Sequence, residues 1–66
     1  MLTDQEKMNN GLKEMLFHEE SMGKKYADLA HQITDPKLQQ MLRGMEMGAR
    51  NHYGTLSQKM TSLGIV

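Results

Sequence analysis

Apolar residues recur along this chain in two long runs that have the spacing of amphipathic helices. Alternating steps of four and three residues from Met8 reach eight positions, seven of them apolar or aromatic: Met8, Leu12, Met15, Glu19, Met22, Tyr26, Leu29 and Ile33. The same steps from Leu38 reach eight positions, six of them apolar: Leu38, Leu42, Met45, Ala49, His52, Leu56, Lys59 and Leu63. A heptad pattern sustained over this length predicts two helices that each bury one stripe.

Local signals define where the two helices begin and end. Thr3 followed three residues later by Glu6 has the spacing of a capping box, which starts a helix. Asp35 is a good N-cap and Pro36 suits the first helical position, whereas the residue before a proline disfavours helix. Gly64 is typical of a helix stop. We therefore predict helices over about 3–33 and 36–63, in a single domain that covers 1–66.

The short connection between these helices predicts an all-α fold in which they pack as an antiparallel two-helix hairpin. Flanking residues widen each apolar stripe: Leu16, Gly23 and Ala30 on the first helix, and Met41, Gly48 and Thr55 on the second. A hairpin has one mutual interface, so part of these stripes should stay exposed until a second hairpin covers it. We therefore expect a homodimer that forms a ferritin-like four-helix bundle. The residues expected in its core and dimer packing are Leu12, Met15, Leu16, Met22, Tyr26, Leu29, Leu42, Met45, Ala49 and Leu56.

Composition narrows the class of protein. The 66 residues include no Cys, so disulfides and Cys-based metal sites are excluded. Eight basic residues balance eight acidic ones, without the basic excess of a nucleic-acid binder. No apolar run approaches the ~18 residues that would span a membrane, and the first residues lack the pattern of a signal peptide. We expect a soluble, cytoplasmic protein whose eight methionines fill helix interfaces.

Two polar residues, Glu19 and His52, interrupt the apolar stripes. Ile33 and Leu38 flank the turn and their residue numbers add to 71; those of Glu19 and His52 do too, so the pair should lie at one level of the hairpin. Polar groups in such a layer need partners. Either the pair fixes the alignment of the helices, or two copies of it bind a metal such as iron or zinc. The neighbouring His18 is expected not to share the face of Glu19 and to be solvated or at the edge of the dimer.

These residues resemble half of a ferritin-like or rubrerythrin-like bundle: Glu19, then Tyr26 one heptad later, Asp35-Pro36-x-Leu38 opening the next helix, and His52 facing back. The resemblance implies a di-iron site built from a Glu on one helix and Glu-x-x-His on the next. The chain departs from that motif, because Ala49 stands where the second Glu would be. Glu46, one turn further back, is the weaker substitute as a metal ligand. The sequence therefore does not predict an enzyme, and no catalytic residue is assigned.

Nearly the whole chain is similar to short ferritin-like proteins of the spore-coat CotF type. The shared motifs are Leu2-Thr3-Asp4, Tyr26, Pro36-Lys37-Leu38 and Gly64-Ile65-Val66. The resemblance implies a structural or assembly role in the spore coat of a spore-forming bacterium, with itself and other coat proteins as partners. The alternatives are a metal-binding protein that holds iron or zinc at Glu19 and His52, and a helical adaptor whose exposed face binds a partner protein.

Overall fold

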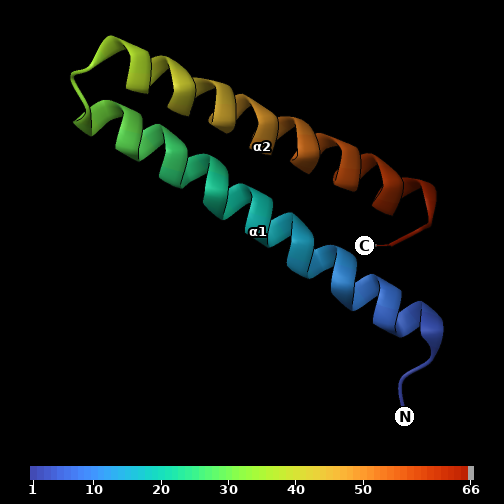
Figure 1. Cartoon of the computed structure of the whole chain (residues 1–66). Coiled ribbons are helices and arrows are strands. Elements are labelled where there is room, and N and C mark those ends of the chain that lie inside the picture. Colours follow the sequence, from blue (N-terminus) through green and yellow to red (C-terminus); the bar gives the residue numbers. More distant parts are fainter. Residues whose placement is uncertain (66) are drawn as a thin grey trace.

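A computed structural model describes residues 1–65, and this part of the chain holds two α-helices and no strand. Helix α1 spans Asp4–Gln32 and helix α2 spans Pro36–Ser62. The two helices run antiparallel and side by side, joined by a tight turn (Figure 1). The fold is therefore an all-α helical hairpin, as the sequence predicts. Val66, which closes the Gly64-Ile65-Val66 motif, lies outside the described residues.

The capping box at the start of α1 forms as predicted. The Glu6 amide donates to Thr3 Oγ1 at 3.1 Å, and the Thr3 amide donates to Glu6 Oε1 at 3.1 Å. These two bonds satisfy backbone donors that the first turn of a helix would otherwise leave without a partner.

Side-chain hydrogen bonds stabilise the turn between the helices at the end of α1 and at the start of α2. Asp35 Oδ1 accepts from the Lys37 amide at 2.9 Å and from the Leu38 amide at 3.1 Å, which caps α2. The side-chain amide of Gln39 donates back to the carbonyl oxygens of Ala30 and Ile33 at the end of α1. Because these bonds tie the two helix ends together, the turn sets the register of the hairpin.

The chain reverses direction after α2 in a Schellman motif. Gly64 adopts φ +73°, its amide donates to the Thr61 carbonyl at 3.1 Å, and the Ile65 amide donates to the Met60 carbonyl at 2.8 Å. This pattern requires the left-handed conformation that glycine adopts without strain. The reversal brings Ile65 into a buried cluster with Met60 and with Leu12 of α1, so apolar contact closes the end of the hairpin opposite the turn.

The helices meet along one edge of each predicted stripe rather than along its centre. Gly23 is buried at this contact, and the buried apolar side chains are Leu12, Ala30, Leu42, Ala49, Met60 and Ile65. Leu16, Met22, Tyr26 and Leu56 are partly buried. Three residues predicted to pack remain about half exposed in this hairpin: Met15, Leu29 and Met45. The physical reason is the small size of Gly23, Ala30 and Ala49, because small side chains let the two helix backbones approach closely along that edge.

The hairpin is a single layer of helices. Its dimensions are 49 × 22 × 13 Å, and the smallest of them is close to the ~10–12 Å diameter of one helix with its side chains. Both broad faces of the layer are therefore open. Within residues 1–65, neither helix is long and apolar enough to cross a membrane.

Candidate functional site

Glu19 of α1 and His52 of α2 lie at the same level of the hairpin. His52 Nδ1 is 3.5 Å from Glu19 Oε1, which makes an ion pair whenever the imidazole is protonated. The level that the sequence predicts for these two residues therefore agrees with the structure. Their position near the middle of both helices places this pair at the centre of one broad face.

The pair is not enclosed by the hairpin. The Glu19 side chain is 23% exposed and the His52 side chain is 69% exposed, and no polar or charged residue among residues 1–65 is buried. The expectation that both side chains point into a core is therefore not met within one chain. The reason is the rotation of α2, which turns Ala49 and Leu56 toward α1 and leaves His52 beside the contact.

Apolar side chains, three of them methionines, surround the pair on the same face. One shallow cavity beside the pair is lined by Met22, Tyr26, Met45, Gly48 and Ala49, and the other by Met15, Thr55 and Leu56. Heptad spacing continues this surface to the ends of both helices. We call it the methionine face and define it by Met8, Met15, Met22, Leu29, Leu38, Met41, Met45, Gly48 and Thr55.

His18 also lines this site, as an exposed side chain at its outer edge, which agrees with the predicted solvated or dimer-edge position. His18 lines both cavities next to Glu19 and His52. Consecutive helical residues point about 100° apart, so Glu19 lies at the helix contact and His18 lies on the open face beside it. Its spacing places it beside two methionines of this surface, since His18 lies three residues after Met15 and four before Met22.

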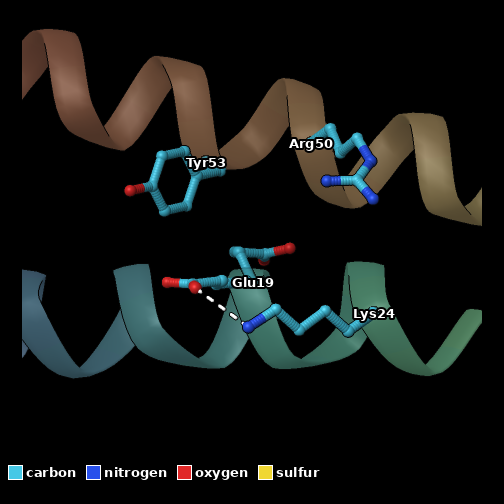
Figure 2. Close-up of a pocket in the computed structure, with 5 residues that line it drawn as sticks. Glu19, Lys24, Arg50 and Tyr53 are labelled. Atoms are coloured by element: carbon cyan, nitrogen blue, oxygen red, sulfur yellow. Dashed lines mark ion pairs between the residues drawn. The ribbon is translucent and has the colours of Figure 1, made fainter.

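The opposite broad face is charged. Glu20 pairs with Lys24 at 3.3 Å, and Arg50 and Tyr53 of α2 lie across from Glu19 and Lys24 of α1 (Figure 2). Further along α2 the face continues with a second group of ion pairs. We call this surface the charged face and define it by Glu20, Lys24, Arg43, Glu46, Arg50 and Tyr53.

Glu46 lies within the charged face and away from His52. Its carboxylate accepts from Arg43 Nη1 at 3.0 Å and from Arg50 Nε at 3.0 Å. The bond from Arg50, followed by the bond from Arg43, lowers the pKa of Glu46 below its ordinary value. The structure therefore brings Glu19 and His52 together but leaves Glu46, the weaker predicted ligand, in an ion-pair network of its own.

One chain supplies too few ligands for a metal centre. Residues 1–65 contain no group of three or more His, Asp or Glu side chains placed to hold a metal ion. A second copy of the pair would double the available donors to two carboxylates and two imidazoles, with His18 close by in each copy.

Comparison of the chain with protein-family models, curated proteins and solved structures finds no match.

Proposed function

We propose that this chain is a self-assembly protein in which two copies pair through the methionine face to form a four-helix bundle. Its role would be structural, as a spore-coat-type component that associates with itself and with other coat proteins. The observation that carries the proposal is the contrast between the two broad faces. Six of the exposed large apolar side chains lie on the methionine face, whereas the ion pairs of Glu20 and Glu46 lie on the charged face, beside the exposed Phe17 and Met47.

The broad side of the hairpin is large enough for a stable dimer interface. The product of the two longer dimensions, 49 and 22 Å, gives a footprint of about 1,100 Å². A specific protein–protein interface buries roughly 800 Å² on each partner, so the footprint exceeds this requirement. The hairpin alone buries six apolar side chains, and a domain of this size is marginally stable without further burial. Pairing would supply that burial.

Charge complementarity selects the relative orientation of the two copies. Face-to-face pairing about a two-fold axis parallel to the helices places α1 of one copy over α2 of the other at the same level. Each Glu19 then lies opposite the His52 of the second copy. An axis across the helices would instead place like residues opposite each other, which is unfavourable for two carboxylates. We therefore assign the first orientation, in which both turns lie at the same end of the bundle.

Side-chain sizes are also complementary in this orientation. Met22 of one copy falls within one residue of the level of Gly48 in the second, because the level relation that pairs Glu19 with His52 pairs residue 22 with residue 49. A Cβ added at Gly48 would have no atom within 4 Å in the single hairpin, so space is open there. A flexible thioether can fill such an irregular gap. Gly48 lowers helix propensity, and close approach of the second copy would offset that cost.

The mass of the protein in solution tests the pairing. Size-exclusion chromatography with light scattering should give twice the 7.6 kDa of one chain. Met15→Glu and Met45→Glu each place a charge on the methionine face and should yield monomers. Met47→Glu is the matched control, because Met47 is 64% exposed and lies beside the charged face, and it should remain dimeric. A wild-type protein that is folded and monomeric up to millimolar concentration would refute the proposal and favour the adaptor alternative.

A second candidate function is metal binding at the centre of the same dimer. The 3.5 Å separation of Glu19 and His52 supports it, because carboxylate and imidazole are suitable ligands for zinc or iron. Glu19 and His52 from two copies would supply four protein ligands, and the ion would sit between the hairpins. Its chemistry would be structural, since it would bind the two chains together.

Metal content separates this candidate from a purely apolar dimer. Untagged protein would be dialysed against zinc or ferrous iron and its metal measured by mass spectrometry. Binding predicts one ion or two for each dimer, lost in Glu19→Ala and in His52→Ala. Glu46→Ala is the control and should retain the metal, because its carboxylate lies in the charged face. Equal metal content in all four proteins would reject the site.

A further inference from the structure

Methionine and leucine are divided between the two apolar surfaces of this hairpin. The contact between α1 and α2 uses Leu12, Leu16, Leu42 and Leu56, with Met60 as its buried methionine. The methionine face places Met at five of its seven large apolar positions: Met8, Met15, Met22, Met41 and Met45. Leu and Met have similar helix propensity, so the helices themselves do not require this division.

Exposure in the single hairpin follows the same division. Met15 is 49% exposed and Met45 is 45% exposed, whereas Met60 is 7% exposed. The thioethers of the methionine face are therefore open to solvent oxidants in one chain and would be covered in a pair. Met60 is shielded in either state, because the hairpin itself covers it.

We propose that the methionine face is an oxidation-sensitive modification site that controls pairing of the chain, an inference that rests on the proposed self-assembly. The oxidant is a peroxide such as hydrogen peroxide. The thioether sulfur attacks one peroxide oxygen, an S–O bond forms, the O–O bond breaks, and the second oxygen leaves as water with both protons. The sulfur is oxidised by two electrons to the sulfoxide and the peroxide is reduced by two.

A sulfoxide on this face opposes pairing. It converts a flexible apolar side chain into a polar one, which must lose its water when the second copy binds. Five such positions on each copy act together, so oxidation shifts the chain from the pair to the single hairpin. Pairing in turn covers the sulfurs and slows their oxidation. Enzymatic reduction of both sulfoxide stereoisomers restores the apolar face, so the modification is reversible.

Peptide mass mapping after graded hydrogen peroxide treatment tests the site. In dilute, monomeric protein, Met15 and Met45 should oxidise faster than in concentrated, dimeric protein. Met47, which is exposed outside the face, should oxidise at equal rates in both states, and Met60 should be protected in both. Equal rates for Met15 at the two concentrations would overturn the inference.

Light scattering on the oxidised protein tests the consequence. Oxidation should raise the dissociation constant of the pair by about tenfold or more, and treatment with methionine sulfoxide reductases of both stereospecificities should restore it. Met47→Leu is the matched variant outside the methionine face, and it should dissociate in peroxide like the wild type. Circular dichroism checks that this variant is helical, and the reductase rescue needs no variant.

The outcomes distinguish the two proposals. If untreated protein pairs and its oxidised form keeps the same dissociation constant, the oxidation site is refuted and the self-assembly role stands. If untreated protein remains monomeric at every concentration, both are refuted. If the reductases remove the sulfoxides without restoring the pair, the loss of pairing has another origin and the methionine face is not the modification site.

Discussion

The Ile65 amide donates to the Met60 carbonyl at 2.8 Å, and both side chains pack with Leu12 of the other helix. This contact depends on Gly64, whose φ of +73° lies in the region that a Cβ disfavours. We expect Gly64→Ala to destabilise the fold by about 1 kcal/mol, because the alanine must adopt a left-handed conformation. Urea denaturation at one fixed protein concentration measures the change.

Gly44 supplies the matched control for that substitution. It lies inside α2, and an added Cβ would have no atom within 4 Å. Gly44→Ala should stabilise the fold by roughly 0.5–1 kcal/mol, because alanine loses less backbone freedom in a helix. If the two alanine variants shifted stability in the same direction, the Schellman motif would not be holding the end of α2.

The stability of the fold should also depend on the N-cap of α2. Asp35→Ala removes the acceptor for two amides at the start of the helix. The expected loss is about 1 kcal/mol, within the range of roughly 0.5–2 kcal/mol for N-cap substitutions. Asp28→Ala is the comparison, since an acidic side chain near the end of α1 opposes the helix dipole and its removal should be neutral or slightly stabilising. A thermal melt of each variant at neutral pH measures its Tm, which should be lower for Asp35→Ala than for Asp28→Ala.

Acidification should weaken the charged face through Glu46. The bonds from Arg50 and Arg43 lower its pKa from 4.5, so folding favours the ionised carboxylate. Its contribution to stability is therefore present above pH 4.5 and is lost as the pH falls through the lowered pKa. Tm should drop below pH 4.5 in the wild type and drop less in Glu46→Gln. Glu14→Gln, at a residue without an ion pair within residues 1–65, should follow the wild type.

The orientation of the two copies can be read from engineered cysteines, because the chain has none of its own. With both turns at one end of the bundle, Thr34→Cys chains should be joined to each other by a short bis-maleimide crosslinker. Ser62→Cys chains should be joined to each other as well. A mixture of the two variants should give few mixed products, since α2 separates these positions by about 40 Å. Mixed products in excess would indicate the opposite orientation and remove the Glu19–His52 argument for it.

Much of this fold could be predicted because its boundaries are set by local chemistry. The capping box at Thr3 and Glu6, the Asp35-Pro36 cap and the Gly64 stop each act through bonds within a few residues, so the sequence specifies them directly. Helix α1 ends one residue before the predicted Ile33, whose backbone is already extended. The hairpin and the common level of Glu19 and His52 follow from these boundaries.

The rotation of each helix about its axis could not be predicted in the same way. Each stripe is wide enough to offer two edges for the contact. Whether α1 packs through the edge of Met22 or the edge of Gly23 depends on how closely the two backbones can approach. That distance is a property of both helices together, not of the spacing along one. The same choice of edge decides that His18 lines the site, because the contact lies toward the other edge of the stripe.

A layer one helix deep leaves nearly every residue within a side chain's length of water on at least one side. Under the proposed pairing, a chain that meets a second copy closes one side, and a chain that does not remains open to proteases. The concentration of the protein would then set its resistance to proteolysis, and paired copies would last longer than single ones.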